Sequence, residues 1–332
     1  MTTRRLIPMV AAALILAALY WRIHPGRIVR VLSASDRAWM AAAFAMLAPL
    51  VLAAAVRLLR LVPTRGISLP EAIELNLAAA TLNLMLPSKM GDLAKGWFFR
   101  QRGHLSGSQA LALVLFERGC DMLALLLWCA AGLAALPRRS RDATVLGWVI
   151  GAGLAAGLLA LGSRACGRAV FGLLERRSPP SWRGRVAALR DAWETMQEFV
   201  WRRPARTLEV ALESLGIWFV NLFQVWMFIR ALGVAMPVMD AMALAPLGIL
   251  AGLAPLTFGG AGTRDAATIY FFRAYFDPAT GAALGVLLTA RYLLLGLAGL
   301  PFLRAMSGGP EPAGQRAARG RAYPPPTSGS PR

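Results

Sequence analysis

Long apolar runs dominate the sequence and restrict its fold more than any other feature. A helix crosses a bilayer with about 20 apolar residues, and runs of suitable length, bracketed by Arg, Pro or Gly, lie at 6–21, 39–56, 109–136, 143–162, 208–230 and 280–303. Hydrophobic residues make up 57% of the chain and charged residues only 16%. We therefore predict an all-α polytopic membrane helix bundle with six full spans.

Two further apolar stretches, 71–86 and 237–258, end in clusters of Pro and Gly. We expect each to enter the membrane as a helix and turn back, forming a re-entrant helical hairpin. Irregular backbone at membrane depth is tolerated only inside protein or beside water. The hairpins should therefore lie within the bundle and not against lipid.

The formal charge of +19 has a distribution that indicates membrane orientation, and we expect no nucleic-acid partner. With both termini in the cytoplasm, most Lys and Arg between spans fall in cytoplasmic loops, including Arg57, Lys95 and ten arginines within 164–206, as the positive-inside rule requires. The first external loop runs against the rule, with Arg22, Arg27, Arg30 and Arg37. The first run also has features of a secretory signal, but without a small-residue cleavage site we expect a retained anchor.

An internal repeat relates the two hairpin regions. The phrases "GDLAKGWFFR" and "TRDAATIYFFR" align at an offset of 173 residues, which carries Asp92 to Asp265 and, further downstream, Arg118 to Arg291. Three predicted spans separate the hairpins, so the second would enter from the opposite side. We predict an inverted repeat with halves at about 71–136 and 237–303, an architecture of many secondary transporters. Ordinary loops of a duplicated helical protein are the alternative.

Arg118 and Arg291 lie inside predicted spans, where a lone arginine costs several kcal/mol and needs an anion. Asp92 and Asp265 each precede one of these arginines by 26 residues. Two structural ion pairs, Asp92 with Arg118 and Asp265 with Arg291, are one interpretation. In the other, the arginines bind a lipid phosphate and the aspartates hold them when the site is empty.

The hairpin tips carry residues suited to an anion. "LPSKMGD" contains Lys89 and Gly91, while "FGGAGTRD" contains Gly260, Gly262 and Arg264. Glycine allows tight turns, and a helix N-terminus presents amide hydrogens to a negative group. We include all five in the predicted lipid site, although neither tip has the spacing of a nucleotide-binding P-loop.

Two glutamates are candidate coupling groups. Glu213 and Gln224 are eleven residues apart and so share a helix face, flanked by Glu209 and Asn221. This face is either a seam of the bundle or a place where Glu213 binds a proton or a cationic headgroup. Glu117, adjacent to Arg118, is a second candidate for coupling.

The segment 163–206 is the longest polar stretch between spans. Apolar residues recur there at helical spacing beside several arginines: Val186, Leu189, Trp193, Met196 and Val200. This pattern predicts an amphipathic helix on the inner leaflet. Capping the helix bundle and docking a partner enzyme are equally open readings.

Metal and catalytic motifs are missing from the sequence. The three cysteines indicate no disulfide framework, and His24 and His104 lack companions at zinc-ligand spacing. No nucleophile, base and acid stand at a useful spacing either. We expect no cofactor, no metal and no enzymatic activity, and we predict a disordered cytoplasmic tail over 307–332.

The motifs "NLMLPSKMGDLAKGWFFR", "LFERGCDML" and "PLTFGGAGTRDAATIYFF", followed by Arg291, resemble the lysylphosphatidylglycerol synthase transmembrane domain family, flippase-like integral membrane proteins. The likeness covers roughly residues 5–305, within a transmembrane domain of 1–306. Asp265 stands where the family usually has glutamate. The family's cytosolic aminoacyltransferase domain has no counterpart in this chain, so we do not expect aminoacyl transfer.

The resemblance implies a lipid translocase of the bacterial cytoplasmic membrane. Its cargo would be a phosphate-bearing phospholipid, anionic or zwitterionic, or a polyprenyl-linked precursor. The alternative is a non-transporting scaffold for a glycosyltransferase or a lipid-modifying enzyme, docked on 163–206. Convergence of Asp92, Arg118, Asp265 and Arg291 on one lipid-accessible cavity would favour translocation, whereas separation into two closed ion pairs would favour the scaffold.

Overall fold

The computed structural model describes residues 23–62, 67–85, 91–101, 105–135, 141–253 and 262–303, and these residues are helical with no strand among them. The first half of the chain forms α2 (Pro25–Ser33), α3 (Arg37–Ala45), α4 (Leu47–Leu61), α5 (Leu69–Met85), α6 (Gly91–Gln101), α7 (Gly107–Ala135) and α8 (Arg141–Gly162). The second half forms α9 (Arg164–Arg177), α10 (Pro180–Arg202), α11 (Pro204–Ala231), α12 (Val238–Gly252), α13 (Thr263–Phe271), α14 (Pro278–Gly299) and a 3₁₀ turn at Leu300–Phe302. The all-α prediction is confirmed.

Four helical stretches within the described residues are long and apolar enough to cross a membrane: Arg37–Leu61, Thr144–Gly162, Pro204–Ala231 and Pro278–Phe302. They match the predicted spans 39–56, 143–162, 208–230 and 280–303. The predicted span 109–136 corresponds to α7, a helix of 29 residues that is not among these four. The predicted span 6–21 and the predicted tail 307–332 lie outside the described residues, so the count of six stays a prediction.

The first of these stretches is interrupted at Met46, between α3 and α4. Pro49 follows three residues later, at the beginning of α4. Proline has no N–H to donate and its ring crowds the carbonyl four residues earlier, here that of Ala45, where α3 ends. The sequence therefore explains why one apolar run forms two consecutive helices.

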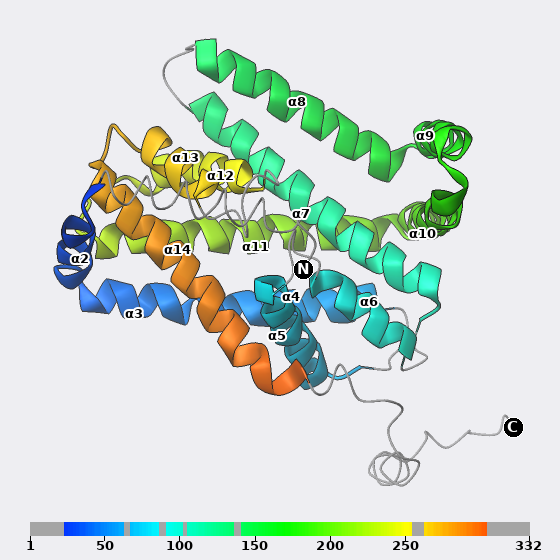
Figure 1. The fold of residues 1–332 in the computed structure, drawn as a ribbon, viewed down its shortest axis with the longest axis horizontal. Helices are drawn as coiled ribbons and strands as arrows, with labels where there is room; N and C mark the ends of the chain where they lie inside the picture. The colour runs from blue at the N-terminus through cyan, green and yellow to red at the C-terminus, as the bar shows by residue number, and fades with distance from the viewer. Residues whose placement is uncertain are drawn as a thin grey trace, which may run out of the picture.

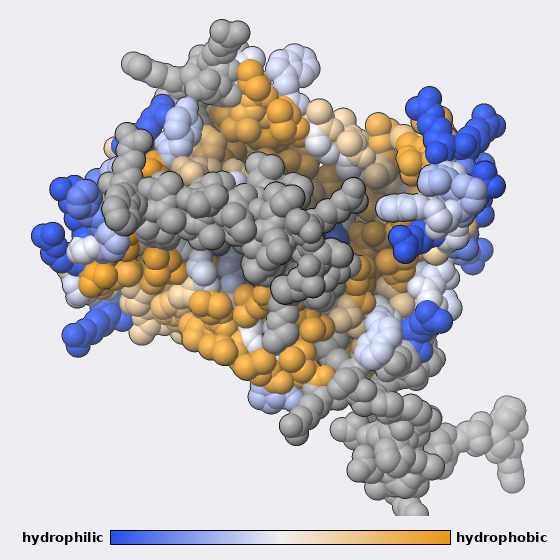
Figure 2. All heavy atoms as spheres, in the orientation of Figure 1, coloured by the Kyte–Doolittle hydropathy of each residue, from blue (hydrophilic) through white to orange (hydrophobic). Residues whose placement is uncertain are grey.

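The long helices lie roughly along one axis of the molecule. In Figure 1, α3, α4 and α11 extend between an end that carries α2 and an end that carries α9 and α10. In Figure 2, hydrophilic side chains gather at these two ends of the visible face, and apolar side chains occupy much of the surface between them. Only 6% of the most apolar window of α8 is buried within the chain, as expected for a helix that faces lipid.

The two predicted hairpin regions occupy opposite halves of the molecule. Figure 1 shows α12 and α13 toward the α2 end and α6 toward the α10 end. Within each region the helices pack on each other, α5 on α6 and α12 on α13. Each first helix also packs against a long helix of the other half, α5 against α14 and α12 against α7. The tips themselves, 86–90 and 254–261, lie outside the described residues.

A glycine permits the close crossing of α7 and α12. A Cβ built on Gly132 would overlap the backbone carbonyl of Ala243, whereas a Cβ on Gly151 in α8 would meet nothing. We expect Gly132→Ala to destabilise the fold by about 1–3 kcal/mol because backbone would have to move. Thermal unfolding in detergent measures this, with Gly151→Ala as the matched control. Equal stability of both variants would contradict the close crossing.

The helix α10 of the amphipathic segment packs against the bundle, as the capping interpretation predicts, while its place on a leaflet stays a prediction. Trp193 and Gln197 of α10 donate hydrogen bonds to the carbonyl of Ala160 at 2.9 Å each, and Gln197 also donates to that of Leu161 at 2.8 Å. These carbonyls belong to the last turn of α8, where the helix itself supplies no N–H donor for them. Of the predicted apolar face, Val186, Trp193 and Met196 are buried, while Leu189 is exposed.

Candidate functional site

Charged side chains are buried in the middle of the bundle, and Arg57 of α4 is the hub of the first group. Its guanidinium donates to Glu117 at 2.8 Å, to Asp121 at 3.2 Å from Nη2 and to the Ser214 hydroxyl at 2.8 Å. Glu117 and Asp121 are four residues apart on α7, so they share a face and bracket the guanidinium. Arg57 is only 3% exposed.

The same group extends to α6. Lys95 lies 3.5 Å from Asp92 and 3.3 Å from Glu117, and Arg118 lies 3.0 Å from Asp92. We call these six residues the N-terminal charge cluster: Arg57, Asp92, Lys95, Glu117, Arg118 and Asp121. It contains three cations and three carboxylates and is therefore electrically balanced. Removal of one buried member would therefore leave an uncompensated charge.

The predicted ion pair of Asp92 with Arg118 is confirmed. The prediction that Arg57 and Lys95 lie in loops between spans is wrong, because Arg57 lies in α4 and Lys95 in α6, and both side chains are buried. The helix of Arg57 continues to Leu61, beyond the predicted boundary at residue 56. The sequence does contain a signal for further buried cations. Glu117 and Asp121 lie in an apolar helix, and the single charge of Arg118 cannot neutralise both carboxylates.

Arg264 and Asp265 begin the second group, at the N-terminal turn of α13. The Arg264 guanidinium lies 2.8 Å from the Asp265 carboxylate, and it donates to the hydroxyl of Thr289 and the carbonyl of Gly285 on α14. A Cβ at Gly285 would lie 2.7 Å from the carboxyl carbon of Asp265. Glycine at this position therefore lets the carboxylate rest directly on α14.

Arg291 of α14 completes the second group and has no carboxylate partner among the described residues. It donates to Asn221 Oδ1 at 2.7 Å, to Gln224 Oε1 at 2.9 Å and to the Tyr292 hydroxyl at 3.1 Å. The predicted ion pair of Asp265 with Arg291 is wrong. The Asp265 carboxylate pairs with the neighbouring Arg264, and Arg291 donates instead to the side-chain amides of Asn221 and Gln224 on α11. We call Arg264, Asp265 and Arg291, with Asn221, Gln224 and Tyr292, the C-terminal arginine cluster.

The C-terminal arginine cluster has an excess positive charge, with two guanidinium groups and one carboxylate. Both guanidinium carbons lie within 6.0 Å of the Tyr292 ring centroid. Arg291 is 3% exposed, and its Nε has no hydrogen-bond acceptor among the described residues. A buried cation without a counter-charge is unfavourable by several kcal/mol, so the arrangement favours an anion as its missing partner.

The distribution of acids in the chain supports this inference. The sequence contains 17 Asp and Glu residues. The side chains of all but two, Asp142 and Glu311, are described, and none of these forms an ion pair with Arg291. The second hairpin tip itself, residues 254–261, contains no Asp or Glu.

Two of the remaining predicted site residues lie outside the described part of the chain, and two lie within it. Lys89 and Gly260 lie outside the described residues. The amide of Gly91 donates to Asn83 Oδ1 at 2.8 Å, which caps α6 next to Asp92. Gly262 has a φ of 93°, a conformation that favours glycine, and it directly precedes α13. Both glycines therefore position the helix turns that hold Asp92 and Asp265.

The candidate coupling glutamates have different surroundings. Glu117 is fully inside the N-terminal charge cluster. Glu213 is partly exposed and forms an ion pair with Arg60, while Gln224 on the same helix is buried against Arg291. A coupling role for either glutamate stays a prediction. Among the residues that the structure describes, no group of His, Cys, Asp and Glu has the geometry to hold a metal ion.

Long apolar helices around buried, networked charges define a polytopic helical membrane protein. Comparison with known families identifies the match: residues 5–299 fit the model of the lysylphosphatidylglycerol synthase TM region. The chain belongs to this family, whose members are membrane proteins related to lipid modification or translocation. No curated protein matches the chain.

Proposed function

We propose that the protein is a lipid translocase that moves a phosphate-bearing lipid between the leaflets of the bacterial cytoplasmic membrane. The observation that carries this proposal is the buried Arg291, which has hydrogen-bonding amides but no carboxylate partner among the described residues. A phosphate supplies the missing charge and accepts charge-assisted hydrogen bonds from guanidinium groups. The cargo is an anionic or zwitterionic phospholipid, or a polyprenyl-linked lipid.

Arg118 is the proposed contact in the other half. Its side chain is 41% exposed, while Arg57 in the same cluster is 4% exposed. Arg118 can therefore exchange Asp92 for a lipid phosphate without dismantling the Arg57 hub. Asp92 holds Arg118 when no lipid is bound, which retains the counter-charge role proposed from the sequence.

An inverted repeat with two re-entrant hairpins would provide alternating access. The reciprocal packing of α5 on α14 and of α12 on α7 supports this architecture, as does the placement of the hairpin regions in opposite halves (Figure 1). With both termini cytoplasmic, α9 and α10 lie at the inner leaflet. Translocation is passive or coupled to an ion through Glu117 or Glu213, and involves no enzymatic step.

Leaflet exchange of labelled phospholipids and polyprenyl-phosphate lipids in proteoliposomes tests the proposal. We expect exchange by the unaltered protein and a loss of about tenfold or more in the Arg118→Ala, Arg291→Ala double variant, because both phosphate contacts are removed. Arg183→Ala, an exposed arginine on α10, is the control. Undiminished exchange in the double variant would contradict the assigned site. Absence of exchange for every lipid by folded protein would favour a scaffold that docks an enzyme on 163–206.

A further inference from the structure

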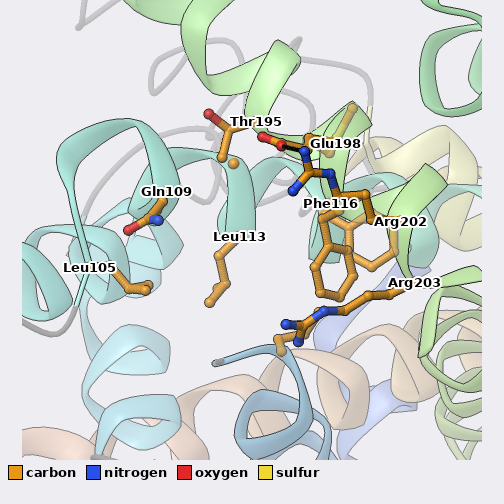
Figure 3. A pocket seen from close by; sticks show the side chains of 12 residues that line it. Leu105, Gln109, Leu113, Phe116, Thr195, Glu198, Arg202 and Arg203 are labelled. Carbon is orange, nitrogen blue, oxygen red and sulfur yellow. Dashed lines mark ion pairs between the residues drawn. The ribbon is translucent and has the colours of Figure 1, made fainter. Parts of the chain in front are cut away.

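A cavity of about 320 Å³ lies between the N-terminal half of α7 and the C-terminal half of α10 (Figure 3). Leu61, at the end of α4, closes a third side. This volume falls within the range of small-molecule sites. The cavity is separate from both charged groups, and the translocation proposal does not use it.

The lining separates into an apolar and a polar part. Apolar side chains from α4 and α7 and from the inner face of α10 include Leu61, Leu113, Phe116, Met196 and Phe199. Polar side chains come mainly from the last two turns of α10, and Figure 3 shows Arg202 beside Glu198 and Arg203 extending toward the open space. A cavity of this kind matches a ligand with an apolar body and a polar end.

The polar part favours an anion. Arg202 is paired with Glu198 at 3.0 Å, whereas Arg203, in the lining and exposed, has no carboxylate within ion-pair distance among the described residues. A second hollow of about 420 Å³ adjoins the cavity across α10 and shares Glu198 and Arg202 with it. Arg164, Arg168 and Glu194 line that hollow, so the two linings together contain four arginines and two glutamates.

The cavity also touches the elements that hold the N-terminal charge cluster. Phe116 directly precedes Glu117 on α7, and Leu61 lies one helical turn after Arg57 on α4. A ligand between these side chains would therefore contact both helices that position the Arg57 hub.

We propose that this cavity binds the hydrocarbon chain of an anionic amphiphile, with the charged end of the ligand at Arg203. The chain enters from the leaflet that contacts α9 and α10. The ligand is a phospholipid or a free fatty acid, which share a chain and an anionic group. The inference rests on the membrane placement given under the proposed function, but it does not require translocation.

Photocrosslinking of the full chain in vesicles tests the site. The probes are palmitate with a diazirine near the chain end, phosphatidylglycerol that carries the same chain, and the neutral methyl ester of the palmitate probe. We expect at least one anionic probe to label peptides of α7 and α10, about tenfold more strongly than the ester. Labelling by the phosphatidylglycerol probe would identify a phospholipid as the ligand, and labelling by the palmitate probe would identify a free fatty acid. Labelling confined to other helices, or equal labelling by the ester, would overturn the proposal.

Two variants with matched controls identify the cavity. Leu113→Trp fills it and should reduce labelling about tenfold, while Leu189→Trp, on the exposed face of α10, should not. Arg203→Gln removes the proposed anion contact and should reduce labelling by the anionic probes alone, in contrast to Arg183→Gln. Arg203 is exposed, so its variant decides the matter even where Leu113→Trp fails to fold. Unchanged labelling in Arg203→Gln would refute the anion contact, and neither result depends on lipid exchange.

Discussion

Replacement of Arg57 by Gln is expected to destabilise the folded protein by about 3–5 kcal/mol, because it leaves buried carboxylates without their shared cation. Glu117 and Asp121 both bond to this guanidinium, and Ser214 accepts a third hydrogen bond from it. Lys95 still contacts the same Glu117 oxygen at 3.3 Å, and Arg118 lies 3.6 Å from Asp121, but the cluster would keep two cations for three carboxylates. The loss is measured as the shift in reversible unfolding in mixed micelles.

A matched arginine and a compensating variant define this experiment. Arg60 lies one turn further along α4 and pairs with Glu213, yet its side chain is 46% exposed. Arg60→Gln should therefore cost less than about 1 kcal/mol. Removal of the stranded charges by Glu117→Gln and Asp121→Asn should restore part of the stability of Arg57→Gln. A cost for Arg57→Gln no larger than that for Arg60→Gln would show that Arg57 is not a structural hub.

Apolar run length predicted the helices well, but it could not predict which charged residues are buried. The run 39–56 ends at the first arginine, so Arg57 was assigned to a loop although its helix continues to Leu61. Lys95 lies between the predicted stretches 71–86 and 109–136 and was therefore expected in a loop, although α6 contains it. Burial of both cations is favourable because Glu117 of α7 meets them, and the sequence does not indicate which cations that acid contacts.

The repeat contains the information that distinguishes the two clusters. The offset that aligns Arg118 with Arg291 aligns Glu117 with Ala290 and Asp121 with Leu294. At these aligned positions the second repeat half therefore lacks the carboxylates that neutralise the arginines of the first half. The aligned aspartates suggested equal ion pairs, but Arg264, adjacent to Asp265, has no cationic counterpart beside Asp92, where the aligned residue is Gly91. A neighbour in sequence thus takes the acid that Arg291 was expected to use.

Replacement of Arg291 by Gln is expected to leave stability nearly unchanged and to reduce lipid exchange strongly, in contrast to Arg57→Gln. Arg291→Gln removes a buried cation that has no carboxylate partner, and the new amide can still donate to Asn221 or Gln224. Relief of the desolvation cost offsets the lost hydrogen bonds, so stability should change by less than about 1 kcal/mol. Lipid exchange in proteoliposomes should nevertheless fall about tenfold or more, because a neutral amide does not attract a phosphate.

Arg57→Gln and Arg291→Gln together separate structure from transport. Each removes one guanidinium from the interior of the same bundle, so a general intolerance of the substitution would affect both stabilities alike. Arg57 has carboxylates that depend on it, and Arg291 has none among the described residues. A large loss of stability in Arg291→Gln would indicate that the protein itself supplies its anion, and normal exchange in a stable Arg291→Gln would exclude Arg291 from the lipid path. Loss of exchange at full stability is the result that a phosphate-binding arginine requires.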